Sequence, residues 1–93
     1  MNKVFLDIGC GKRKQPGHIG IDMLKLPGVD IVWDPANRLP FEDTSVDGIY
    51  SNFMLEHSAN FIFVVKEMYR VCKSGAAIKV RVPASLFSQA SRA

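Results

Sequence analysis

A glycine turn directly after a short apolar segment restricts the fold of this chain more than any other feature of its sequence. Residues 3–8, KVFLDI, are rich in strand-forming residues and stop at Gly9, and Gly11 follows two positions later. Apolar residues stand on both faces of this segment, which is typical of a strand buried inside a parallel sheet. Glycine lets the backbone turn sharply and lie close to a ligand. The pattern predicts a central strand that ends in a ligand-binding turn, with an ordinary structural turn as the alternative.

The rest of the chain has the pattern of further strands joined by short links. Strand-forming segments are expected at 18–22, 29–33, 48–53 and 76–83. The apolar spacing predicts a helix from Phe61 to Cys72. Ser58 or Asn60 can cap the start of this helix, and Gly75 can end it. Because the links between the first three strands are too short for the usual crossover helix, we expect an α/β fold with reduced helices and a parallel sheet.

Length and composition are those of one small globular domain, residues 1–93. The chain has 93 residues, of which 47% are hydrophobic and 23% charged. Its net charge of +3 is scattered apart from residues 12–14, so nucleic-acid binding is not expected. The longest apolar run, Phe61 to Val65, is far too short to span a membrane. Two cysteines without metal-ligand spacing suit a reducing compartment, and we expect a cytoplasmic protein without a metal site.

Three carboxylates fall at or near the carboxyl ends of predicted strands. They are Asp7, Asp22 and Asp34. Open α/β sheets bind ligands at this edge. An acidic residue that ends the second strand can accept hydrogen bonds from both hydroxyls of a ribose, and Asp34 could accept one from an adenine amino group. The carboxylates together with the glycine turn therefore predict a nucleoside ligand.

Four segments of the chain resemble successive motifs of the class I S-adenosylmethionine-dependent methyltransferases, and within them the methyltransferase type 11 proteins. These segments are LDIGCG, IGID, WDPANRLPFEDTSVDGIYSNFMLEH and VVKEMYRVCKSGAAIKVRVP, and the resemblance covers residues 4–83. It implies a Rossmann-like sheet in the strand order 3-2-1-4-5. It also implies S-adenosylmethionine as the cofactor and methyl transfer as the reaction. The acceptor suggested by the short turn is a glycan or another small molecule.

The resemblance also assigns roles to individual residues. Asp7, Gly9 and Gly11 would surround the methionine part of the cofactor. Asp22 would hold the ribose, Asp34 with Pro35 and Ala36 would frame the adenine, and Ser51 and Asn52 would lie beside the methyl group. Cys10 and Met23, as neighbours of these residues, complete the expected cofactor-binding set.

The sequence departs from the family pattern in ways that affect acceptor binding. Arg13 replaces the third glycine of the usual turn, and the helices around the first two strands are missing or reduced. The chain is expected to be a partial domain that stops after the fifth strand, without the antiparallel strand pair of the family. A bare sheet face and an open fifth-strand edge would then favour self-association.

His57 is the candidate general base, because a neutral imidazole can accept a proton near pH 7. Its alternative role is to shape the pocket at the start of a helix. Two other functions stay open at this point. One is a catalytically silent cofactor-binding or interaction module. The other is a nicotinamide-dependent oxidoreductase, although Lys14 stands where the dinucleotide motif requires glycine.

Overall fold

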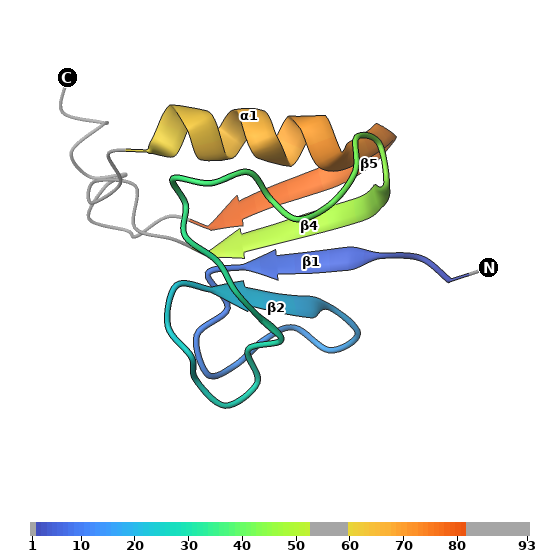
Figure 1. Ribbon diagram of the computed structural model, residues 1–93. Coiled ribbons are helices and arrows are strands. Elements are labelled where there is room, and N and C mark those ends of the chain that lie inside the picture. Colours follow the sequence, from blue (N-terminus) through green and yellow to red (C-terminus); the bar gives the residue numbers. More distant parts are fainter. Residues whose placement is uncertain (1, 53–59, 82–93) are drawn as a thin grey trace, which may run out of the picture.

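One sheet of parallel strands forms the centre of the protein, in the order β3-β2-β1-β4-β5 expected from the sequence. The computed structural model describes residues 2–52 and 60–81. The elements are β1 (Phe5–Ile8), β2 (Ile19–Asp22), β3 (Ile31–Val32), β4 (Val46–Asn52), α1 (Phe61–Val71) and β5 (Cys72–Arg81) (Figure 1). The links 9–18 and 23–30 contain no helix, which confirms the reduced architecture.

The end of α1 differs from the expectation that Gly75 stops the helix. The helix ends at Val71, and Cys72 is already extended. The last carbonyl groups of α1 are satisfied by another segment, because the amides of Thr44 and Ser45 donate to Arg70 O and Val71 O at 2.9 and 2.8 Å. Hydrogen bonds from a distant loop thus replace the local glycine cap.

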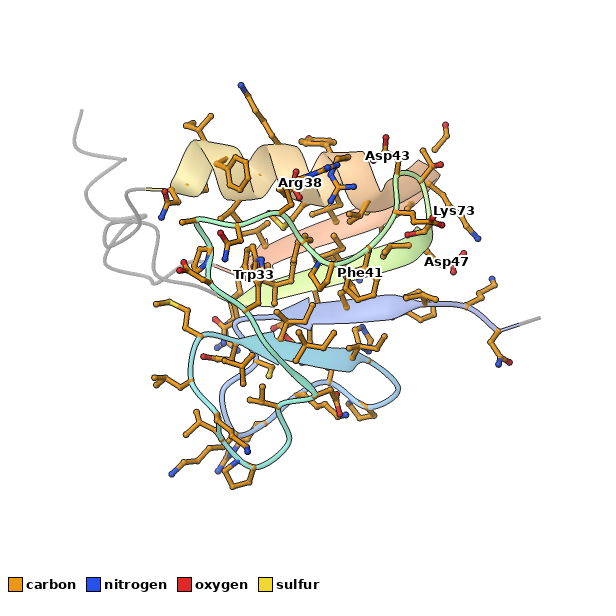
Figure 2. All side chains as sticks on the ribbon, viewed as in Figure 1. Trp33, Arg38, Phe41, Asp43, Asp47 and Lys73 are labelled. Atoms are coloured by element: carbon orange, nitrogen blue, oxygen red, sulfur yellow. The ribbon has the colours of Figure 1, made fainter. Side chains whose placement is uncertain are left out.

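Gly75 instead lies in a bulge at the start of β5. Val46 of β4 pairs with Cys72 and Gly48 pairs with Ala77, so residues 73–76 all lie opposite Asp47. Gly75 has a φ of +84°, which favours glycine in this bulge. Lys73 reaches from the bulge to Asp47 at 3.0 Å (Figure 2). The fifth strand therefore begins earlier than the predicted residue 76.

The start of α1 is only partly described. Asn60 occupies the N-cap position, but its side chain makes no capping hydrogen bond. Ser58, the other predicted cap, lies outside the described residues. Within residues 2–52 and 60–81, helices of the length and hydropathy that a bilayer span requires are absent.

A hydrophobic core lies between one face of the sheet and the segments that cross it. Leu6, Ile8, Ile21 and Ile49 supply the sheet side of this core, and α1 supplies Val64, Met68 and Val71. Trp33, Leu39 and Phe41 of the segment 33–45 pack on the same core, and Figure 2 shows Trp33 and Phe41 along that segment. The alternation of side chains along each strand explains this arrangement, because every second residue faces the core.

The second face of the sheet is covered at β2 by the two links instead of helices. The position where Gly20 of β2 would carry a Cβ is 3.0 Å from Cys10 Sγ, 3.1 Å from Lys14 Cδ and 2.7 Å from Gly28 O. Because Gly20 has no side chain, both links can lie in contact with β2 at this position. Beyond the links, the sheet has a hollow of about 670 Å³ whose lining includes Phe5 and Tyr50. Self-association through this face stays a prediction.

An ion pair between Glu67 and Arg70 of α1 forms hydrogen bonds to the segment 38–43. Glu67 is 6% exposed, and its carboxylate accepts hydrogen bonds from Leu39 N and from two nitrogens of Arg70. Arg70 also donates to the carbonyls of Leu39 and Phe41 and to the Asp43 carboxylate. All five N–H groups of this guanidinium are thus used. The Arg70 guanidinium lowers the pKa of Glu67 below its usual value.

We expect acid to destabilise the protein through Glu67. Because the pKa of Glu67 is lower in the folded chain, its contribution to stability is complete above the ordinary glutamate value of 4.5 and is lost as the pH falls below it. The urea midpoint should stay level between about pH 7 and 5 and then fall. In the variant Glu67→Gln, the urea midpoint should depend less on pH below 4.5. Equal pH dependence in the two proteins would contradict the assignment.

Candidate functional site

The carboxyl ends of β1, β2 and β4 meet at one edge of the sheet, where the sequence predicted the ligand. Ile8 lies between Ile21 of β2 and Ser51 of β4 in the parallel register. Directly after Ile8 the chain turns back on β2, since the amides of Gly9 and Cys10 both donate to Ile21 O, at 2.7 and 3.2 Å. Gly9 and Gly11 adopt φ values of +77° and +58°. The predicted turn is therefore a tight loop of left-handed glycines.

Asp22, at the end of β2, holds this turn in place. Its Oδ2 accepts a hydrogen bond from Gly11 N at 2.8 Å, and its Oδ1 accepts one from Leu24 N at 3.1 Å. Each carboxylate oxygen has a second lone pair, and the side chain is half-buried. Space beyond Gly11 is open, because a Cβ there would meet no atom of the described residues within 4 Å. The turn and Asp22 thus form one unit with free acceptor capacity.

Asp7 lies beneath the same turn and is 1% exposed. Its Oδ2 accepts a hydrogen bond from Gln15 N at 2.7 Å. Its Oδ1 has no hydrogen-bond partner, and it is the one buried side-chain oxygen or nitrogen in this state within the part of the chain that the structure describes. A buried carboxylate oxygen without a partner is costly. It is therefore a group that a bound ligand or water could satisfy.

The segment after β3 places the three residues predicted to frame an adenine at the surface. Asp34 Oδ1 accepts a hydrogen bond from Ala36 N at 2.9 Å, which forms a tight turn with Pro35 at its centre. Trp33, which could have stacked on a base, is buried in the core, and its indole N–H donates to the carbonyls of Asn37 and Arg38. The structure thus assigns Trp33 to packing.

The remaining predicted site residues differ in their surroundings. Ser51 is fully buried and its hydroxyl lies 3.3 Å from Ile8 O, to which it donates. Asn52 and Met23 are exposed at the same edge of the sheet. His57, the candidate base, lies outside the described residues. The roles of these residues toward a cofactor stay predictions.

Cys10 lies inside the glycine turn and is 7% exposed. Burial raises the pKa of its thiol, and the nearby carboxylates of Asp7 and Asp22 raise that pKa further. The thiol is therefore neutral near pH 7.

Two charged residues near the turn were not predicted to contribute to the site. Lys14 entered only as one of the basic residues 12–14 and as a departure from the dinucleotide motif, and Asp30 was not singled out. In the structure Lys14 Nζ lies 2.7 Å from Asp30 Oδ2 and bridges the two links. Their separation of 16 positions leaves no local pattern in the sequence.

A second hollow, of about 460 Å³, lies away from this edge beside Arg38, Phe41 and Arg70. Arg70 has no N–H group left for a ligand there, because all five are used within the protein. Within residues 2–52 and 60–81, His, Cys, Asp and Glu side chains form no group of three that could hold a metal ion. The edge with Asp7 and Asp22 is therefore the stronger candidate.

Fold and site together define a Rossmann-like domain in which a glycine turn meets an acidic residue of the second strand at the carboxyl edge of the sheet. Residues 17–80 match the family model described as a methyltransferase domain. The chain belongs to this family of class I methyltransferases. This assignment also argues against the nicotinamide-dependent alternative.

Curated relatives support the same assignment. The demethylmenaquinone methyltransferases of Bacillus cereus (strain B4264) and Bacillus anthracis (strain A0248) are each 32% identical over 71 residues. The match covers 76% of this chain and 27% of each relative, so the chain spans about a quarter of their length. No solved structure gives a significant match.

Proposed function

We propose that the protein binds S-adenosylmethionine at the carboxyl edge of its sheet and transfers the methyl group to a small-molecule acceptor. The observation that carries this proposal is the joined arrangement of the glycine turn and Asp22, with two carboxylate oxygens that each retain a lone pair. The ribose of the cofactor offers two hydroxyl donors that fit this acceptor pair. The unpartnered Asp7 Oδ1 adds a buried acceptor under the same turn.

The residues suit this cofactor better than a ligand that carries phosphate at the turn. A phosphate site would use the N-terminus of a helix behind the glycines, and the link 9–18 contains no helix. Asp7 and Asp22 would moreover repel an anion. A sulfonium cofactor carries a positive charge and no phosphate, so both carboxylates would favour its binding.

Bound S-adenosylmethionine supplies an already activated methyl group. The protein then has to hold cofactor and acceptor in line, and such positioning supplies several kcal/mol of the rate enhancement. Asp22 and the turn of Gly9 and Gly11 would fix the donor. Acceptors that are hydroxyls or amines also need a base, for which His57 is the candidate.

The acceptor class is inferred from two sources. The short turn resembles that of methyltransferases of glycan synthesis, whereas the relatives are named for demethylmenaquinone. Both are non-protein acceptors. A cytoplasmic location fits this proposal.

The variant Asp22→Ala should weaken binding of S-adenosylhomocysteine, measured by isothermal titration calorimetry. Loss of two hydrogen bonds to a charged acceptor corresponds to roughly 1.5–3 kcal/mol, about ten- to 150-fold in the dissociation constant. Asp22→Asn can still accept from Gly11 N, so its dissociation constant should lie between those of the unaltered protein and Asp22→Ala. Glu42→Ala, an exposed carboxylate far from the edge, serves as control.

A methyl-transfer assay with glycan and quinone acceptors separates the enzyme from the silent module. Binding of the cofactor without turnover on any acceptor would favour the silent module. Unchanged affinity in a folded Asp22→Ala protein would contradict the ribose assignment. Failure of the unaltered protein to bind S-adenosylhomocysteine would overturn the proposed function.

A further inference from the structure

The link 9–18 is attached to the sheet at its two flanks. On one flank Gly11 N donates to Asp22, and on the other Gln15 N donates to Asp7, at 2.8 and 2.7 Å. Both acceptors belong to the candidate cofactor site. Residues 12–14 span the interval between these two attachments, so a fixed position of this interval also fixes the two amides and the carboxylates that they bind.

Asp30 gives this interval a fixed point on β2. Its backbone amide donates to Gly20 O at 2.8 Å, and its Oδ2 accepts from Gly20 N at 2.7 Å. Two reciprocal hydrogen bonds therefore hold Asp30 to a buried residue of the sheet. The same Oδ2 accepts from Lys14 Nζ at 2.7 Å, which connects the first link to this point. Hydrogen bonds from Lys14 and Gly20 lower the pKa of Asp30, so the carboxylate is ionised at neutral pH.

Lys14 is also placed by packing. Its Cδ is one of the three atoms closest to the position where Gly20 would carry a Cβ. The aliphatic part of the side chain thus lies over β2, while its ammonium group meets Asp30. The side chain occupies the face of the sheet where a crossover helix would usually pack.

We propose that Lys14 and Asp30 are positioning residues that clamp the glycine turn in the geometry that binds the cofactor, in place of the missing helix. The clamp acts on the cofactor through Gly11, Asp22 and Asp7 and does not itself contact the cofactor. Its effect on cofactor affinity rests on the proposed function. Its effect on the geometry of the turn does not depend on the proposed function.

The test compares Lys14→Met with Arg13→Met in the full 93-residue chain. Both variants lose one positive charge from the same link, but Met at position 14 keeps the aliphatic packing and removes only the contact with Asp30. Lys14→Met should raise the dissociation constant of S-adenosylhomocysteine about three- to fivefold, the upper range for a partly exposed ion pair. Arg13→Met should leave it unchanged, and Lys14→Arg should restore it.

Amide hydrogen exchange in the protein without ligand reports on the turn itself. Lys14→Met should accelerate exchange at Gly11 and Gln15 and leave the amides of β4 unchanged. Equal exchange and equal affinity in Lys14→Met and Arg13→Met would overturn the clamp. Uniform acceleration throughout the sheet would also overturn it, because the residue would then serve overall stability. If the unaltered protein binds no S-adenosylhomocysteine, the proposed function fails, and the exchange rates still decide on the clamp.

Discussion

Arg70→Met should destabilise the protein by about 3–5 kcal/mol, measured as the free energy of unfolding in urea. The substitution leaves the Glu67 carboxylate buried without its cation. It removes five hydrogen bonds, two to Glu67 and three to the segment 38–43. Domains of this size are typically stable by only about 5–15 kcal/mol. The change therefore removes a large share of the total stability.

Two further variants test whether loss of the ion pair causes this destabilisation, and a third serves as a control. Arg70→Lys keeps the charge but offers three donors in place of five, so it should still cost about 1–3 kcal/mol. The double variant Glu67→Met with Arg70→Met removes both charges and should be more stable than Arg70→Met alone. Lys66→Met, an exposed neighbour on α1, should change little. A double variant that is no more stable than Arg70→Met alone would contradict this account.

Gly20→Ala should destabilise the protein by about 1–3 kcal/mol and weaken S-adenosylhomocysteine binding more than tenfold. A methyl group at this position would lie 2.7 Å from the Gly28 carbonyl oxygen, so the link 23–30 has to move. The same methyl group would lie 3.0 Å from Cys10 Sγ inside the glycine turn, and the turn is also connected to Asp30 of that link through Lys14. Thermal unfolding and calorimetric titration measure the two effects.

Gly17→Ala is the matched control for Gly20→Ala. Gly17 has a φ of +75°, so alanine there introduces backbone strain, but its Cβ would meet nothing within 4 Å among the described residues. Gly17→Ala should lower the stability of the protein without changing its affinity for S-adenosylhomocysteine. Normal binding in Gly20→Ala would show that the links can shift without moving the turn.

The positions of the carboxylates could be predicted because they follow from local patterns, whereas the sheet order was expected from the resemblance to the methyltransferase family. Alternating apolar residues mark the strands, and parallel strands bring their carboxyl ends to one edge. Asp22 therefore meets Gly11 of the turn, and Asp7 holds Gln15 of the same link. His57 lies outside the described residues, so its role stays a prediction.

Several contacts that hold the fold together could not be predicted, because they join residues distant in the sequence. Thr44 and Ser45 satisfy the end of α1 where Gly75 was expected to do so. Glu67 and Arg70 are spaced as a helical ion pair, a signal that was available, but their partners at 39–43 were not visible from spacing. The backbone angles of Gly20 do not require glycine, and only the close packing of both links explains why glycine occupies this position.

The raised pKa of the Cys10 thiol has a chemical consequence for a turn proposed to hold a methyl donor. Sulfur attacks alkylating groups as the thiolate, and burial with Asp7 and Asp22 nearby disfavours the thiolate. The same carboxylates that would attract a positively charged sulfonium therefore also keep the adjacent cysteine protonated. A sulfonium bound at the turn would thus lie beside a sulfur atom that is not in its nucleophilic form.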